Sequence, residues 1–161
     1  MPSDGGAAKQ ITQLASAYRP TWLSNGRIAF QSNRSLYTIR ANGSDMRRVP
    51  LSGANAPSWS PLGRNIVFIK RNHVYLVRSD GSRLRRLTSG RGIDNDPAFS
   101  PDGRWIVFTR TIRTNSASGD YPNLWLIDIH GHNAHRIIRE PPAPGGGYTA
   151  GAYEPAWQPL P

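Results

Sequence analysis

The chain has 161 residues, of which 37% are hydrophobic, so it is long enough for one domain with a buried core and is not disordered by composition. It contains no cysteine, which excludes disulfides and thiolate metal sites. The formal net charge is +10, from 20 Lys and Arg against 10 Asp and Glu, so an acidic partner has to be considered.

The chain begins with residues 4–12, which resemble the end of a repeat whose beginning is absent. Asp4-Gly5 corresponds to the later pairs Asn42-Gly43 and Asp80-Gly81, each of which precedes a short basic and apolar segment. Asn-Gly and Asp-Gly are strong signals for two-residue hairpins, because both central residues of a type I′ turn need a positive φ. We therefore expect residues 4–12 to end in an outer strand.

Three full repeats follow at residues 19–50, 56–88 and 96–138, and a partial repeat stands at residues 154–159. A repeat period near 40 residues is typical of a repeat architecture. The repeated positions are an aromatic residue, a turn glycine and a strand phenylalanine, with a complete Ser-Pro-Asp-Gly turn in the third copy: Trp22, Gly26, Phe30, Trp59, Gly63, Phe68, Phe99, Pro101, Asp102, Gly103, Phe108 and Trp157.

The turn between the first two strands of each repeat is complete only once. Pro101 presets a backbone angle, Asp102 can bond the local backbone and Gly103 tolerates a positive φ. The other copies have Asn25 and Leu62 in place of the acid, so we expect one turn contact to be missing there.

Each full repeat is predicted to hold four short strands, named a to d in chain order. The expected strands are 19–23, 27–31, 36–40 and 45–50 in the first repeat, 56–60, 65–70, 73–78 and 83–88 in the second, and 96–100, 104–110, 123–129 and 134–138 in the third.

Strands b and c of each repeat are apolar on both faces. In strand b of the second repeat, Ile66 and Phe68 lie on one face by the period of two, while Val67 lies on the other. A four-stranded antiparallel sheet with two apolar faces has to be covered on both sides. This is the condition of a blade in a β-propeller.

The order of these features resembles the WD40-like repeats of TolB-type propellers over nearly the whole chain, from about Asp4 to Pro159. The resemblance implies an all-β partial β-propeller: a single segment over residues 1–161, with about three four-stranded antiparallel blades, an N-terminal outer strand and a C-terminal inner strand. It also implies an interaction scaffold that often works outside the cytoplasm, in the periplasm of bacteria. The N-terminus itself lacks the apolar region of a signal peptide.

Three blades do not close a ring, since propellers typically use four to eight. The chain is interpreted as part of a larger propeller, as an arc that self-associates to close a ring, or as an arc that is stable alone. Exposed apolar blade faces would make such an arc prone to association.

Two long connections in the third repeat, residues 111–122 and 139–153, are predicted to emerge on the same face, because b–c and d–a connections share one end of an antiparallel blade. Long loops on a rigid scaffold often carry binding; the alternative is that they are tolerated insertions. The candidate ligand or partner residues are Arg113, Asn115, Asp120, Tyr121, Arg139, Glu140, Tyr148 and Tyr153.

No catalytic, metal or cofactor site is predicted. His130, His132 and His135 fall at a hairpin turn, without cysteine or a carboxylate pair to complete a metal shell. The pair Asp94 and Asp96 precedes strand a and is interpreted as structural rather than as an acid–base pair. No nucleophile motif of the Gly-x-Ser-x-Gly type occurs.

The sequence therefore favours a non-catalytic scaffold that binds a protein or peptide, itself, or missing blades. The alternatives are the propeller part of a prolyl-oligopeptidase-type serine peptidase, or of a propeller lyase or lactonase whose catalytic parts are absent. The arginine clusters fall on the predicted outer strands, where charge protects an exposed edge, so nucleic acid is an unlikely partner. No apolar run is long enough to span a membrane.

Overall fold

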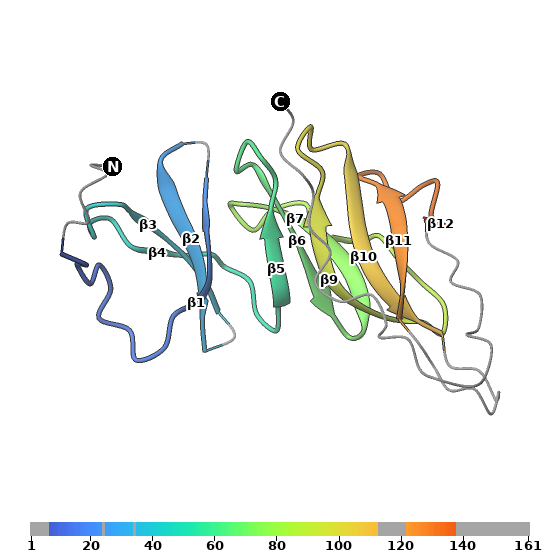
Figure 1. The fold of residues 1–161 in the computed structure, drawn as a ribbon, viewed down its shortest axis with the longest axis horizontal. Helices are drawn as coiled ribbons and strands as arrows, with labels where there is room; N and C mark the ends of the chain where they lie inside the picture. Colours follow the sequence, from blue (N-terminus) through green and yellow to red (C-terminus); the bar gives the residue numbers. More distant parts are fainter. Residues whose placement is uncertain (1–6, 24, 34, 113–121, 138–161) are drawn as a thin grey trace.

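The computed structural model describes residues 7–23, 25–33, 35–112 and 122–137. The described residues form three four-stranded antiparallel sheets that lie side by side in chain order (Figure 1). Blade 1 contains β1 (Tyr18–Trp22), β2 (Arg27–Ser32), β3 (Ser35–Arg40) and β4 (Arg47–Arg48). Blade 2 contains β5 (Asn55–Trp59), β6 (Asn65–Lys70), β7 (His73–Arg78) and β8 (Arg85–Arg86). Blade 3 contains β9 (Ile93–Phe99), β10 (Trp105–Thr111), β11 (Pro122–Asp128) and β12 (His135–Arg136).

The sheets confirm the predicted all-β class and the partial propeller. Each sheet runs in simple order from strand a to strand d, as a propeller blade does. The first strands pair with the second in equivalent registers, with Trp22 opposite Ile28, Trp59 opposite Ile66 and Phe99 opposite Ile106. The aromatic residue of each first strand therefore has an equivalent partner on the second strand.

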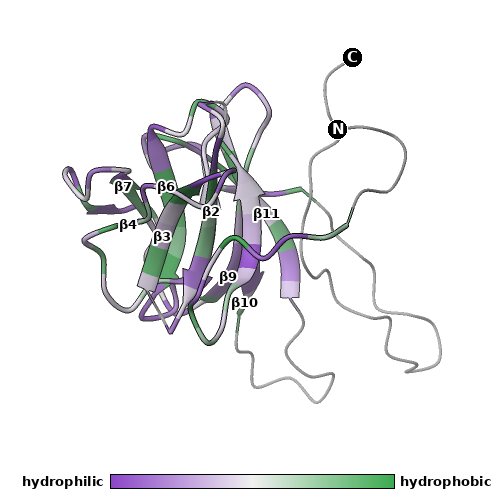
Figure 2. Cartoon of the chain, turned by 90° about the vertical axis from the view of Figure 1, so that its left-hand side faces the viewer, coloured by the Kyte–Doolittle hydropathy of each residue, from purple (hydrophilic) through white to green (hydrophobic). Residues whose placement is uncertain are grey.

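Apolar clusters join neighbouring blades. Leu36 and Val49 of blade 1 pack with Ile66, Phe68 and Val77 of blade 2. On the other face of blade 2, residues of β6 and β7 pack with blade 3, in a cluster that contains Val67, Ile69, Val74, Leu76, Phe99, Ile106, Phe108 and Ile127. Figure 2 shows hydrophobic residues concentrated along the strands and hydrophilic residues at the turns. Both faces of blade 2 are thus covered, as the period-two pattern predicts.

The fourth strand of each blade is shorter than predicted. β4, β8 and β12 contain two residues each, and each starts late because the residue two positions before it has a left-handed backbone: Asp45 at φ 55°, Arg83 at φ 54° and Asn133 at φ 57°. A left-handed residue cannot continue an extended ladder. After each short fourth strand, single backbone hydrogen bonds still join the chain to the third strand; Leu87 N, for example, donates to Val74 O at 2.8 Å.

The turn between strands a and b is formed as predicted, with one correction. Gly26, Gly63 and Gly103 have φ of 75°, 67° and 70°. Asp102 Oδ1 accepts from Arg104 N at 3.0 Å, and Asn25 Oδ1 accepts from Arg27 N at 3.1 Å in the same way. The contact that we expected to be absent in blade 1 is therefore present, because an amide oxygen accepts as a carboxylate oxygen does. Leu62, the third residue at this position, is 65% exposed and has no side-chain oxygen to make it.

Residues 7–12, the described part of the N-terminal partial repeat, form no ladder and so are not a strand. They nevertheless lie where the end of a fourth strand would lie. A Cβ on Gly43 would meet the backbone of Ile11, as a Cβ on Gly131 would meet Leu87, the residue after β8. The C-terminal partial repeat, with the inner strand predicted at residues 154–159 and its Trp157, lies outside the described residues.

Candidate functional site

One end of the blades gathers the b–c turns and the d–a links, and we call this end the loop face. The start of β9 lies against the turn between β6 and β7, since Asp94 N donates to Asn72 O at 3.0 Å. Arg110, near the end of β10, donates from Nη2 to Ser89 O in the link that precedes β9, at 3.5 Å. The expected placement of b–c and d–a connections at one end is thus present at the junction of blades 2 and 3.

A buried ion pair lies beneath the loop face at this junction. Asp94 is fully buried, and its two oxygens accept from Nε and Nη2 of Arg110 at 2.5 and 2.9 Å. Thr88 Oγ1 donates a short hydrogen bond to Asp94 Oδ2, and it accepts from Val74 N at 2.9 Å. Such a bidentate, charge-assisted pair fixes both side chains in one geometry.

Aromatic rings surround the guanidinium. Arg110 lies over the rings of Phe108 and Trp125, with distances of 5.3 and 5.2 Å to their centroids. Among the described residues, the buried ring nitrogens His73 Nδ1 and Trp125 Nε1 have no hydrogen-bond partner, and His73 Nδ1 lies 3.7 Å from Asp94 Oδ2. The cluster therefore combines residues of blades 2 and 3 around one carboxylate.

The cluster around Asp94 is suited to hold β9, β10 and the link before β9 together rather than to transfer protons. Both oxygens of Asp94 already accept hydrogen bonds from Arg110 and Thr88, and none of the carboxylate is exposed to a substrate. The junction of blades 1 and 2 has a simpler link at this end, in which Gln31 Nε2 donates to Ala54 O at 3.2 Å. Among the described residues, the ion pair thus lies at the base of one of the two long connections, residues 111–122.

Asp96 is separated from Asp94 by a backbone irregularity in β9. The register of β9 against β10 shifts here, and Asp96 has a φ of 47°. Arg19 and Ala56 occupy the same place in β1 and β5, with φ of 55° and 46°, and each stands before a proline. Such β-bulges redirect a side chain. Arg19 Nη1 lies 3.9 Å from Asp96 Oδ1, so the first strands of blades 1 and 3 converge as inner strands do around a propeller axis.

The candidate residues predicted for the loop face all lie outside the described residues. These are Arg113, Asn115, Asp120, Tyr121, Arg139, Glu140, Tyr148 and Tyr153. The cluster of Asp94, Arg110 and Thr88 was missed as a group, although Asp94 had been assigned a structural role. A signal for it is present in the sequence: Arg110 lies two residues beyond Phe108, on the face of the strand that Phe108 shares.

The basic outer strands are exposed, as expected. Arg47 and Arg48 form β4, and Arg85 and Arg86 form β8. Arg85 reaches the next blade, where its guanidinium donates to the carbonyls of Ile129 and His130. These arginines thus also connect outer strands to neighbouring turns.

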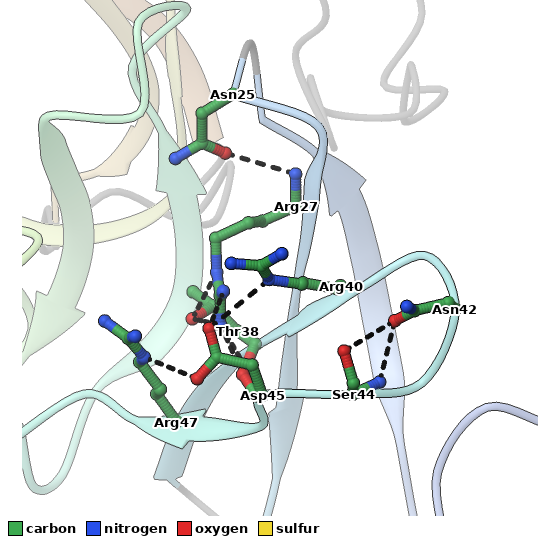
Figure 3. Close-up of polar contacts among 8 residues, drawn as sticks. All are labelled: Asn25, Arg27, Thr38, Arg40, Asn42, Ser44, Asp45 and Arg47. Atoms are coloured by element: carbon green, nitrogen blue, oxygen red, sulfur yellow. Dashed lines mark hydrogen bonds and ion pairs between the residues drawn. The ribbon is translucent and has the colours of Figure 1, made fainter.

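A second polar cluster lies at the opposite end of blade 1, around Asp45 (Figure 3). Asp45 Oδ2 accepts from Arg27 Nη1 at 2.8 Å, and Asp45 Oδ1 accepts from Arg47 Nε at 2.8 Å. Arg40 Nε lies 3.5 Å from Oδ2, and Arg27 also donates to Thr38. The hydrogen bonds from Arg47 and Arg27 lower the pKa of Asp45 from 3.8 to about 2.

The Asp45 pKa gives a testable expectation. Since the folded pKa is below the unfolded one, the stabilisation is present above about pH 4 and is lost as the pH falls towards 2. We expect NMR titration of the Asp45 carboxyl to give a midpoint near 2, and Arg47→Ala to move it towards 3.8. Arg48→Ala is the control, because Arg48 bonds Ser35 instead. A midpoint near 3.8 in the intact protein would contradict the network.

The histidine-rich turn is held by Asp128. Asp128 Oδ1 accepts from His130 N and His132 N, both at 2.8 Å, and Oδ2 accepts from Asn133 Nδ2 at 2.9 Å. Within the part of the chain that the structure describes, no group of three or more His, Cys, Asp or Glu side chains is placed to hold a metal ion. Among the same residues, no helix is long and apolar enough to cross a membrane.

Residues 1–159 match the protein family described as the TolB beta propeller domain. A TolB homologue of Chlorobium luteolum is 32% identical over 136 residues, which cover 78% of this chain and 30% of that protein. The solved structure of a protein described as a putative TolB of Agrobacterium tumefaciens is similar at a TM-score of 0.67 and 23% identity, over 86% of this chain and 55% of that one. An acylaminoacyl peptidase of Pyrococcus horikoshii has a TM-score of 0.57 at 13% identity, over 76% of this chain and 25% of that one. The chain thus spans between a quarter and just over half of the length of these proteins.

Proposed function

Because the chain belongs to the TolB beta propeller domain family, we propose that it is a non-catalytic propeller segment that binds a protein or peptide through its loop face. The blades provide a rigid scaffold, and the long connections of the third repeat provide the contacting residues. Tyrosine and arginine, which are frequent in those connections, are the residue types most enriched at binding hot spots.

The proposal rests on the ion pair that holds the strand ends beneath the loop face in one geometry. The Asp94–Arg110 pair joins the end of β10 to the start of β9, and Thr88 and Ser89 of the preceding link bond to this pair. A loop that leaves such a fixed strand end loses less conformational entropy on binding than one that leaves a mobile end. Residues 111–122 leave this strand end, which makes them a suitable binding element.

The test is selection of binding peptides from a displayed library of random 12-residue peptides. We expect the intact chain to enrich peptides whose affinity falls at least about fivefold when Tyr121 and Tyr148, one on each long connection, are both changed to alanine. Leu62→Ala is the matched control, since Leu62 is a large apolar residue that is 65% exposed at the opposite end of the blades. Enrichment that survives the tyrosine changes, or that is lost equally with Leu62→Ala, would refute a loop-face site.

A second candidate is the propeller of a serine peptidase. The likeness to the Pyrococcus acylaminoacyl peptidase concerns the fold and supports this candidate only to that extent. A hydrolase domain encoded in frame beside this segment would favour the peptidase candidate over the scaffold.

A further inference from the structure

We propose that the outer rim of blades 1 and 2 binds to the surface of an anionic lipid bilayer. The rim consists of the two outer strands, each with the two residues before it, which are residues 45–48 in blade 1 and 83–86 in blade 2. Its arginines bind the lipid phosphates, and its two apolar side chains enter the boundary between headgroups and acyl chains. This interaction goes beyond ligand binding at the loop face and does not depend on it.

The rim lies on the outer edges of the blades, where neighbouring blades do not cover it. β4 and β8 are the last strands of their sheets, and each pairs with a strand of its own sheet on one side only. Blades contact one another instead through sheet faces and inner strands, as β5 and β9 do. A flat surface can therefore touch the edges of two adjacent blades at once, whatever the number of blades in the ring.

The two outer edges repeat one pattern of charge and apolar exposure. β4 and β8 pair with the third strands of their blades in equivalent registers, and all their arginines are exposed. A large apolar residue directly precedes each strand: Met46 is 46% exposed and Leu84 is 47% exposed. Basic residues beside exposed apolar ones are the composition of segments that lie in the membrane interface.

Blade 2 carries the larger uncompensated charge. In blade 1, the carboxylate of Asp45 accepts hydrogen bonds from Arg27 and Arg47 (Figure 3). The equivalent left-handed position in blade 2 is Arg83, so a base stands where blade 1 has an acid. Among the described residues, no hydrogen bond or ion pair holds the side chain of Arg83 or Arg86. Their guanidinium groups are available to an external phosphate, which arginine binds well.

Two features favour a lipid surface over other acidic partners. No residue of the rim is aromatic, whereas proteins that bind single-stranded nucleic acid stack the bases on aromatic side chains. The outer strands have two residues each and follow a left-handed residue, so the edge is too short for an acidic peptide to add as a strand. An anionic bilayer attracts arginines and also accepts aliphatic side chains at its interface.

Blade 3 lacks this composition and provides matched control positions. Ala134 and His135 stand where blade 2 has Leu84 and Arg85. Blade 3 therefore has neither the large exposed apolar residue nor the pair of arginines. The membrane-binding surface ends at blade 2.

The experiment measures co-sedimentation of the full chain with large unilamellar vesicles. One set is phosphatidylcholine alone, and the other contains about 30% phosphatidylglycerol, an anionic lipid. We expect binding to the anionic vesicles to be at least about tenfold stronger than to the neutral ones, because several arginines each contribute near an anionic surface. This preference should fall as salt is added, since salt screens exposed charges.

Two double variants separate the charged and the apolar contributions. Arg83→Asn with Arg86→Ser should weaken binding to anionic vesicles at least about tenfold, because each arginine near the surface contributes about fivefold. Asparagine tolerates the left-handed backbone, as Asn133 does at the same place in blade 3. Met46→Ser with Leu84→Ser should weaken binding at least about fivefold, because no apolar side chain then enters the interface.

The matched control is Arg104→Ser with Arg136→Ser, which removes the same charge from exposed positions of blade 3. It should change binding no more than about twofold, since charges beyond a Debye length are screened. Circular dichroism checks that each variant is folded.

Four results overturn the proposal. They are equal binding to neutral and anionic vesicles or binding to neither, a blade 3 variant that loses as much affinity as the Arg83 and Arg86 variant, and full binding after Met46→Ser with Leu84→Ser. The fourth is a duplex DNA that displaces the chain from vesicles as strongly as free anionic vesicles do at equal phosphate concentration, because the rim then binds polyanions in general.

Discussion

Replacing Asp94 with alanine should lower the free energy of unfolding by about 3–5 kcal/mol, the usual cost of leaving a buried charge without its partner. Arg110, whose side chain is 11% exposed, would keep its charge between Phe108 and Trp125. Thr88 Oγ1 would lose the acceptor that it now has in Asp94. The measurement is the midpoint of denaturant-induced unfolding, followed by circular dichroism.

Two further variants decide whether the buried charge causes this loss. The double variant Asp94→Leu with Arg110→Met should be more stable than Asp94→Ala alone, because an apolar pair replaces a buried ion pair at little cost. Asp102→Ala should cost much less than Asp94→Ala, since the exposed Asp102 only bonds its own turn. Equal losses for Asp94→Ala and Asp102→Ala would show that the pair contributes no more than an ordinary surface contact.

The blade architecture could be predicted because the sequence repeats one local pattern three times. The apolar period of two fixed the faces of β2, β6 and β10, and the turn glycines fixed the reversals before them. The predicted b and c strands agree with the observed ones to within one residue at each end. Local chemistry, namely turn residues and side-chain alternation, was sufficient for these elements.

Contacts between distant residues could not be predicted in the same way. Asp94 and Arg110 are 16 positions apart, and Thr88 belongs to the preceding repeat. Asp94 and Asp96 looked like a pair with the spacing of one strand face, but the left-handed Asp96 turns its carboxylate towards Arg19 of blade 1. A bulge before proline leaves no regular trace in hydrophobic periodicity, so its effect on side-chain direction appears only in the structure.

The shortness of the outer strands has a similar cause. The sequence extends the predicted strands from residue 45 to residue 50 and from residue 83 to residue 88, because basic and apolar residues continue there. The backbone at Asp45 and Arg83 is left-handed, which delays the start of the ladder. Neither residue type requires this conformation, so propensity alone does not reveal it.

Replacing Phe68 with alanine should also cost about 3–5 kcal/mol, by removing a large buried ring and leaving a cavity. Phe68 is 0% exposed, stacks on Tyr75 at 5.8 Å between centroids and belongs to the cluster that joins blades 1 and 2. A loss of this size is a large part of the 5–15 kcal/mol of a typical domain, so the variant should unfold at a much lower denaturant concentration. Denaturation followed by tryptophan fluorescence and circular dichroism measures it.

The same phenylalanine-to-alanine change in blades 1 and 3 tests whether packing between blades determines the loss of stability. Phe108→Ala should cost as much as Phe68→Ala, because Phe108 is 0% exposed within the cluster between blades 2 and 3. Phe30→Ala should cost less, because Phe30, although buried, belongs to neither of the clusters that join blades. Leu62→Ala, at a 65% exposed residue, should change stability by no more than about 0.5 kcal/mol. If Phe30→Ala is as damaging as Phe68→Ala, the packing between blades does not determine how much these phenylalanines contribute to stability.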